Sequence, residues 1–197
     1  MRTTLLCILL SQWLLAFTPA YAGTDPWKES YRLENLFQYD AALTALNNVS
    51  GDDELLLLRR GWLNYLKGSH SKAIDYYKKA INKNSKSLDA RLGIILPLLA
   101  QQRWREAELN ANNALAIAPW NYYAHIRLME AEQALKQWQQ LATHAQAVHE
   151  HYPSDASVLI YLARAQQRLG NHDAARSAYQ KVLELLPDNF EASEFVK

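Results

Sequence analysis

The sequence predicts an all-α solenoid of stacked antiparallel helical hairpins, and three observations support this fold class. The chain resembles itself at an offset of 34 residues, a period typical of helical-hairpin repeats. Residues that cap helices recur at that offset, and apolar residues recur at helical spacing within each unit. A single hairpin cannot bury its apolar face alone, so neighbouring units must stack.

Several columns of the self-alignment stay in register over four units. One column holds good N-cap residues, whose side-chain oxygens accept hydrogen bonds from free backbone N–H groups: Ser87, Asn121, Asp155 and Asn189. Two positions earlier, Ser85 is followed in register by residues that cannot continue a preceding helix: Pro119, Pro153 and Pro187. Gly68 and Gly170 suit the left-handed conformation that ends many helices.

In its period and residue types this register resembles the tetratricopeptide repeat family. The residues that match the family pattern are Gly61 and Ala163 in the first helix of a unit and Ala73, Ala107, Ala175, Tyr77 and Tyr179 in the second. Two units match less closely, since Ile95 and Met129 replace the small residue and Leu141 replaces the alanine. The resemblance implies a right-handed superhelix, and it specifies fold far more strongly than function.

The predicted organisation is a single repeat domain over residues 23–197. Residues 24–49 form a degenerate first hairpin, and residues 190–197 begin a C-terminal cap helix, as the ends of solenoids require. Between them lie four repeats, at 54–87, 88–121, 122–155 and 156–189. Pro97 falls inside the first helix of 88–121 and is expected to kink it. The kink either reshapes the surface locally or is a tolerated distortion.

Residues 1–22 have the order of a secretory signal peptide. Arg2 precedes an apolar run, Leu5–Phe17, and Ala20–Ala22 is a small-x-small cleavage site. The run is too short for a comfortable membrane span, so we expect no stable membrane insertion after cleavage; the alternative is an uncleaved anchor. The signal is of bacterial type, which implies a periplasmic protein. Cys7, the only cysteine, lies in this segment, so the mature chain is expected to form no disulfide.

Charge and motifs argue against several function classes. Loss of Arg2 with the signal peptide leaves 20 basic and 20 acidic side chains, and this even balance argues against a nucleic-acid or anionic-membrane surface. The sequence contains no phosphate-binding glycine loop, nucleophile elbow or H-E-x-x-H motif, so we expect no catalytic residues and no cofactor.

Three histidines near the end of one predicted helix are the best metal candidates: His144, His149 and His151. His149 stands in a column that is otherwise apolar, which favours packing over ligation: Ile81, Leu115 and Leu183. No cysteine or suitably placed carboxylate completes a tetrahedral set, so we predict no metal site.

The resemblance also implies a ligand surface, because the first helices of this family line a concave face that commonly binds peptides. The positions carried over to that face are Arg59, Trp62 and Tyr65, then Leu92, Leu96 and Leu99, then Tyr123, Arg127 and Glu130, and finally Tyr161, Arg164 and Arg168. Aromatic residues and arginines are enriched at binding hot spots, and arginine binds carboxylates through paired hydrogen bonds. The alternative for Trp62, Tyr65 and the leucines is simple filling of the superhelix interior.

Two functions follow as expectations. The first is a non-catalytic periplasmic scaffold that binds a protein segment in the concave groove, within a cell-envelope assembly or secretion complex. The second is a glycan-binding module that assists polysaccharide export, with Trp62, Tyr65, Tyr123 and Tyr161 stacking on sugars.

Overall fold

The computed structural model describes residues 25–197, and within them every regular element is helical. The all-α solenoid predicted from the sequence is confirmed. The predicted signal peptide, residues 1–22, lies outside the described residues. The helices are α1 (Pro26–Asn35), α2 (Tyr39–Ala45), the short 3-10 helix η1 (Leu46–Asn48), α3 (Glu54–Leu66), α4 (His70–Lys83), α5 (Leu88–Ala100), α6 (Trp104–Ile117), α7 (Tyr122–Ala134), α8 (Trp138–His151), α9 (Ala156–Arg168), α10 (His172–Leu185) and α11 (Phe190–Val196).

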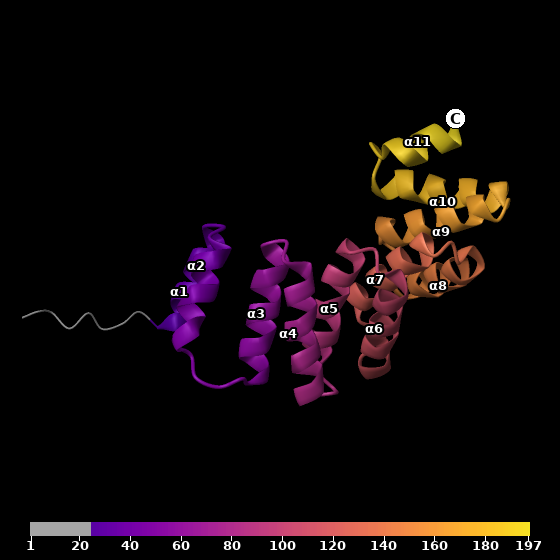
Figure 1. The fold of residues 1–197 in the computed structure, drawn as a ribbon. Helices are drawn as coiled ribbons and strands as arrows, with labels where there is room; N and C mark the ends of the chain where they lie inside the picture. The colour runs from indigo at the N-terminus through magenta and orange to yellow at the C-terminus, as the bar shows by residue number, and fades with distance from the viewer. Residues whose placement is uncertain (1–24) are drawn as a thin grey trace, which may run out of the picture.

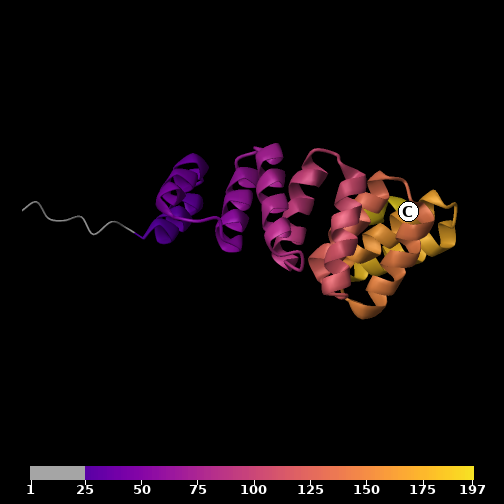
Figure 2. The same cartoon turned by 60° about the horizontal axis from the view of Figure 1, so that its bottom comes forward.

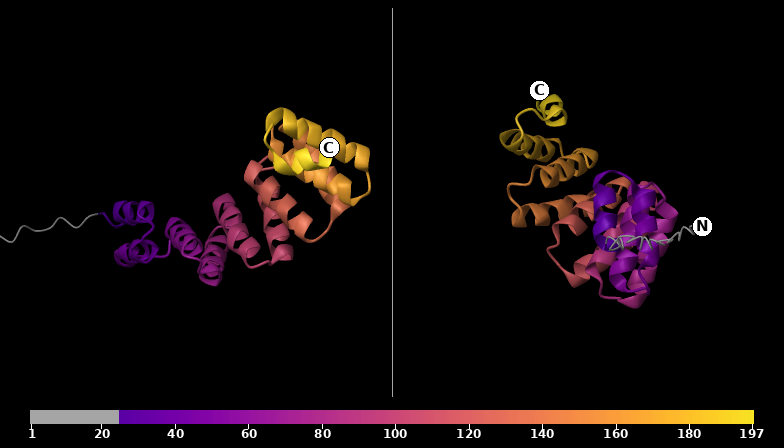
Figure 3. Two further views of the ribbon diagram at one scale, coloured as in Figure 1. Left: turned by 90° about the horizontal axis from the view of Figure 1, so that it is seen from above. Right: turned by 90° about the vertical axis from the view of Figure 1, so that its left-hand side faces the viewer.

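Consecutive helices pair as antiparallel hairpins that stack in chain order (Figure 1). The first helices of neighbouring hairpins also contact one another: α3 packs on α5, α5 on α7 and α7 on α9. The direction of the helices changes along the array. Helices α1–α5 form one row, whereas α8–α11 cross it and stack above its far end, as the views in Figures 2 and 3 also show. The chain therefore curves through space, and the first helices share one inner surface.

Side-chain caps fix where the first helix of each unit begins. A serine, asparagine or aspartate before α3, α5, α7, α9 and α11 accepts a hydrogen bond from the backbone N–H three residues later. The cap residues are Asp53, Ser87, Asn121, Asp155 and Asn189, with distances of 2.7–3.1 Å. The N-cap column predicted from the repeat is thus confirmed, and such caps contribute about 1 kcal/mol each.

The same helices end in one shared motif. A residue with positive φ, between 58° and 81°, follows α1, α3, α5, α7 and α9, at Phe37, Gly68, Gln102, Lys136 and Gly170. The next backbone N–H then donates back to a carbonyl inside the helix, at 2.8–2.9 Å. Glycine adopts this conformation without a steric penalty, whereas Phe37, Gln102 and Lys136 adopt it as strained residues.

The close contact between the second and third hairpins depends on two glycines. The buried ring of Tyr77, on α4, lies between Gly61 on α3 and Gly93 on α5. A Cβ atom at Gly93 would lie 2.3 Å from Cε1 of Tyr77, and one at Gly61 would lie 2.9 Å from the same atom. The ring therefore occupies the space of two missing side chains and joins three helices.

The less regular repeats keep their cores with larger residues. Ile95 and Met129, which replace the small residue of the register, are both fully buried, as is Leu141. Helix α5 continues through Pro97 as one element to Ala100, and Pro97 itself is buried. The proline is accommodated within the core of the unit.

Helix α11 closes the described array against α10. Glu191 accepts hydrogen bonds from Arg164 on α9, at 2.7 Å for Nε, and from the hydroxyl of Tyr179 on α10, at 2.7 Å. The hydrogen bond from Arg164 holds the pKa of Glu191 below its ordinary value. Phe195 packs on the ring of Tyr179, so both polar and apolar contacts attach this helix.

We predict that Gly93→Ala destabilises the protein by about 1–3 kcal/mol, because the new methyl group would lie 2.3 Å from Cε1 of Tyr77 and would force the ring out of its place between α3 and α5. Urea denaturation followed by far-UV circular dichroism measures this loss. In a Tyr77→Leu background the same change is expected to cost less, since the two sites are in contact. A Gly93→Ala protein as stable as the parent would contradict the proposed packing.

We predict that Lys136→Gly stabilises the protein by about 0.5–1 kcal/mol, because it removes the penalty of the left-handed conformation at the end of α7. Lys136→Ala is the matched control, since it removes the same side chain and keeps the strain. Thermal denaturation of the three proteins measures the effect. Equal melting temperatures for the glycine and alanine variants would count against strain at this position.

Candidate functional site

A concave pocket of about 440 Å³ lies on the inner surface, formed by the first helices α1, α3, α5 and α7. We call this pocket the groove. Its apolar and aromatic lining consists of Tyr31, Leu55, Leu58, Trp62, Leu92, Leu96, Tyr77 and Tyr123. Two of these side chains stand far into solvent: Leu55 is 58% exposed and Tyr123 is 61% exposed. Large apolar side chains left exposed inside a concavity are typical of binding sites.

The N-terminal wall of the groove is a polar network around Arg59, in which the Nη2 atom of Arg59 is buried without a hydrogen-bond partner. Its guanidinium pairs with Glu34, donates from Nε to Oγ of Ser30 at 3.2 Å, and lies 3.8 Å from the centre of the Tyr31 ring. Glu34 also accepts a 2.7 Å hydrogen bond from the indole N–H of Trp62. The charge of Arg59 is therefore neutralised within the protein, and Arg59 is buried. Its role is to hold α1 against α3 and to fix the Trp62 ring.

Arg127, on α7, differs from Arg59 because no carboxylate neutralises it. One guanidinium nitrogen donates to the carbonyl oxygen of Leu92 at 2.7 Å, and the group lies 5.7 Å from the centre of the Tyr123 ring. Within residues 25–197 it forms no ion pair shorter than 4 Å. Burial lowers the pKa of Arg127 and raises that of Glu130, one turn further along α7. Arg127 thus stands in the groove without a carboxylate at ion-pair distance, although the lining also includes the carboxylate of Asp89.

The other predicted positions fall outside this pocket. Arg164 is paired with Glu191 and donates to Gln133 at 3.3 Å, while Arg168 lies 5.6 Å from the ring of Trp138. These arginines line a smaller pocket of about 250 Å³ near α11. Tyr161 is half-buried near Arg164, and burial raises its pKa. The predicted continuous face is therefore divided into two pockets.

Two further predicted positions serve packing. The ring of Tyr65 lies between Trp62 and His70, with ring centres 5.7 and 5.8 Å away. Leu99 is buried in the core of the third hairpin. Sequence reasoning missed Tyr31 and Glu34, since the first hairpin is out of register. It also missed Leu55, although the 34-residue register places Leu55 in the same column as Tyr123 and could have identified it.

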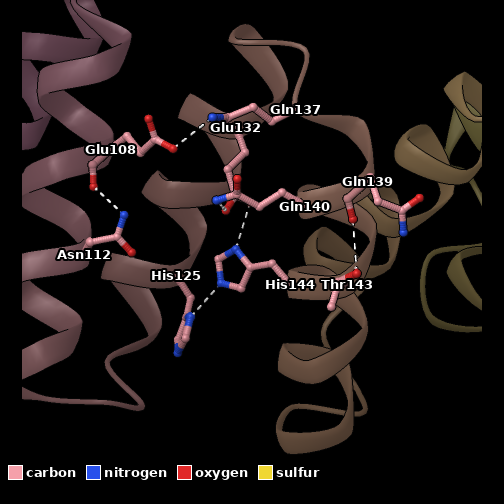
Figure 4. A network of polar contacts seen from close by, with 9 residues as sticks. All are labelled: Glu108, Asn112, His125, Glu132, Gln137, Gln139, Gln140, Thr143 and His144. Atoms are coloured by element: carbon pink, nitrogen blue, oxygen red, sulfur yellow. Dashed lines mark hydrogen bonds and ion pairs between the residues drawn. The ribbon is translucent and has the colours of Figure 1, made fainter.

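A buried polar network lies between α7 and α8 (Figure 4). Nδ1 of His144 lies 2.9 Å from Oε2 of Glu132, and its Nε2 lies 2.9 Å from Nδ1 of His125. Nε2 of His125 in turn lies 2.9 Å from the carbonyl oxygen of Pro119. The second oxygen of Glu132 accepts from Gln140 at 3.0 Å.

Counting protons shows that this network is electrically neutral. The Pro119 carbonyl only accepts, so Nε2 of His125 carries a proton. One further proton lies between the two rings, and another lies between His144 and Glu132. Three protons on two imidazoles and one carboxylate leave no net charge, which burial favours. Because all four ring nitrogens are engaged, the network acts as a structural joint of the hairpin.

The remaining candidate metal ligands lie apart from this network. His151 stacks on Trp120 with ring centres 4.1 Å apart, and Nδ1 of His149 is buried without a hydrogen-bond partner. Among residues 25–197, no three histidine, cysteine or acidic side chains are placed to hold a metal ion. In the same part of the chain, no helix has the length and apolar character of a membrane span.

We predict that His149→Leu stabilises the protein by about 1 kcal/mol at neutral pH, because it removes a buried polar atom that lacks a partner. Burial lowers the pKa of His149 below 6.5 in the folded protein, so the unfolded chain binds protons more readily. Stability is then fully present above about pH 6.5 and falls as the pH drops below it. Thermal denaturation at pH 7.5 and 5.5 is expected to show a smaller acid loss in the variant; an equal loss would exclude this role of His149.

Comparison with known proteins agrees with this architecture. Two family models described as tetratricopeptide repeat match residues 32–90 and 120–188. A search of curated proteins gave no match. Among solved structures, MamA from Desulfovibrio magneticus RS-1 is similar, with 19% identity, a TM-score of 0.76, and coverage of 84% of this chain and 95% of that one.

Two further solved structures resemble the chain to a comparable degree. YrrB, described as a TPR protein with an unusual peptide-binding site, has 16% identity, a TM-score of 0.73, and coverage of 86% and 89% of the two chains. A tetratricopeptide repeat protein from Parabacteroides merdae has 14% identity, a TM-score of 0.77, and coverage of 87% and 69%. At these identities the likeness establishes the fold. The two matched regions, residues 32–90 and 120–188, are similar to tetratricopeptide repeats.

Proposed function

We propose that the protein is a non-catalytic scaffold, exported to the periplasm, that binds a segment of a partner protein in the groove. Domains of this family generally serve as protein-interaction scaffolds, and one similar structure is described as having a peptide-binding site. The observation that carries the proposal is the exposure of Leu55 and Tyr123 within a concave apolar pocket. Neither side chain contributes to the core, so packing alone does not explain them.

The groove also indicates what the partner segment presents. Its walls are mainly apolar, Arg59 and Glu34 neutralise one another, and the carboxylate of Asp89 also lines the pocket. Arg127 is left as an unneutralised guanidinium beside Tyr123. A segment with apolar side chains and one carboxylate placed to reach Arg127 would satisfy both features, since arginine binds a carboxylate through charge-assisted hydrogen bonds.

The location and the process are part of the same proposal. The order of charge, apolar run and small residues in 1–22 supports export, and the repeat array supports a role in assembling other proteins. We place the protein in a cell-envelope assembly or secretion complex of the periplasm. Binding of exported polysaccharide to the groove aromatics is the competing outcome of the test below.

The test uses a Leu55→Ala/Tyr123→Ala variant in affinity capture from an envelope extract, followed by titration of the captured partner. We expect the double variant to bind at least about tenfold more weakly, because both truncations remove exposed contact surface in the groove. Leu109→Ala is the matched control, since Leu109 is 59% exposed on the outer helix α6 and lies outside the groove.

The controls decide between the outcomes. Both variants alter exposed residues, so their melting temperatures are expected to equal that of the parent. Partner binding lost in both variants, or in neither, would refute the groove assignment. Binding of an oligosaccharide, lost with the same double variant and unaccompanied by a protein partner, would replace the scaffold with a glycan-binding module.

A further inference from the structure

A second, polar crevice lies between α2, α3 and α4, away from the groove, and has a volume of about 390 Å³. The side chains used in the argument below come from all three helices and from η1: Thr44, Asn47, Arg60, Asn64, Lys72 and Tyr76. A volume of this size admits a small molecule rather than a single ion.

The 34-residue register gives this crevice counterparts in every later unit. The crevice between α8, α9 and α10 is its counterpart three repeats further on, with Leu162 in place of Arg60 and Ala174 in place of Lys72. In the two intervening units, Ile94 and Leu128 stand at the position of Arg60, and Glu106 and Gln140 stand at the position of Lys72. None of the three later units has a cation at either position, so the fold itself does not require one.

The guanidinium of Arg60 makes only long polar contacts for a group that is mostly buried. Its side chain is only 19% exposed, yet its contacts are long: 3.5 Å to a carboxylate oxygen of Asp52 and 3.4 Å to the carbonyl oxygen of Leu46. Good N–H···O hydrogen bonds are 2.7–3.2 Å long, so neither contact compensates fully for desolvation. Asp52 is 71% exposed, so it competes only weakly with an anionic ligand for the guanidinium of Arg60.

The surroundings of Arg60 add positive charge and polar groups. Lys67 is neutralised by Asp40, whereas Lys72 has no carboxylate within 4 Å among residues 25–197. The hydroxyl of Tyr76 and the side-chain amide of Asn47 also line the crevice. Arg60 and Lys72 therefore line the same polar crevice, and neither is held in a short ion pair.

The sequence around Lys67 and Lys72 is rich in basic residues, which also favours an anionic ligand. Residues 67–91 contain seven basic and two acidic side chains. The basic residues are Lys67, Lys72, Lys78, Lys79, Lys83, Lys86 and Arg91. The even balance of the whole chain conceals this local excess. Of these seven, Lys67 and Lys72 line the crevice, and the others extend the positive charge along α4 toward α5, which raises the local concentration of anionic ligands.

We propose that this crevice binds a small molecule that carries a phosphate or carboxylate beside hydroxyl groups. Arg60, on α3, engages the oxyanion through paired hydrogen bonds, and Lys72, on α4, adds a second charge. Asn47 and Tyr76 bind the hydroxyl groups. The site is independent of the groove and belongs to the outer surface of the first two hairpins.

The experiment is a calorimetric titration of the protein at fixed ionic strength with glucose 6-phosphate, glucuronate, inorganic phosphate and, as the neutral control, glucose. We expect saturable binding of at least one anionic sugar and none of glucose. Comparison of the first two probes distinguishes a phosphate from a carboxylate ligand. The variant Arg60→Leu/Lys72→Ala introduces the residues that the last repeat has at these two positions, and we expect it to bind at least about tenfold more weakly.

The variant is expected to fold at least as well as the parent, because leucine and alanine already occupy these positions elsewhere. If the variant does not fold, the parent protein is tested alone by NMR. We then expect the side-chain amide signals of Asn47 and Asn64 to shift when the anionic sugar is added. Equal affinity of parent and variant, absence of saturable binding by every anionic probe, or unshifted amide signals would overturn the proposal. The Leu55→Ala/Tyr123→Ala variant of the groove is expected to retain full binding.

Discussion

The ring of Tyr77, packed between Gly61 and Gly93, is the contact on which the concave groove depends. It brings α3 and α5 together over α4, and the same ring forms part of the groove floor. Burial raises the pKa of its hydroxyl above the ordinary value for tyrosine. Because Leu58 and Trp62 lie on α3 and Leu92 and Leu96 on α5, their separation is set by how closely these helices approach.

Stacking also determines which charges remain available to a partner. The register places arginines at 59, 127 and 164 on the inner helices, but contacts between hairpins neutralise two of them. Glu34 reaches Arg59 from the first hairpin, and Glu191 reaches Arg164 from α11. Arg127, in the middle of the array, keeps only the Leu92 carbonyl and the Tyr123 ring as close partners. One arginine thus remains for recognition because both others attach the terminal units.

The fold could be predicted from the sequence because it depends on local rules that recur every 34 residues. The caps at Ser87 and Asp155 and the glycine turns at Gly68 and Gly170 require only their own neighbours. The site could be predicted only in part, because it depends on contacts across units. Nothing local shows that Glu34 neutralises Arg59, or that Glu132 is buried beside His144. The closeness of Gly93 to Tyr77 also went unnoticed, since it lies two residues from the column of small residues.

The central claim is that the groove, and not the outer surface, contacts a partner protein. Site-specific photocrosslinking in living cells tests it most directly, with a photoreactive amino acid placed at position 123 in the groove or at position 109 on α6. Tyr123 and Leu109 are similarly exposed, so unspecific collisions affect both positions equally. We predict one protein adduct of defined mass from position 123 and none from position 109. The same adducts from both positions, or none from position 123, would contradict the account.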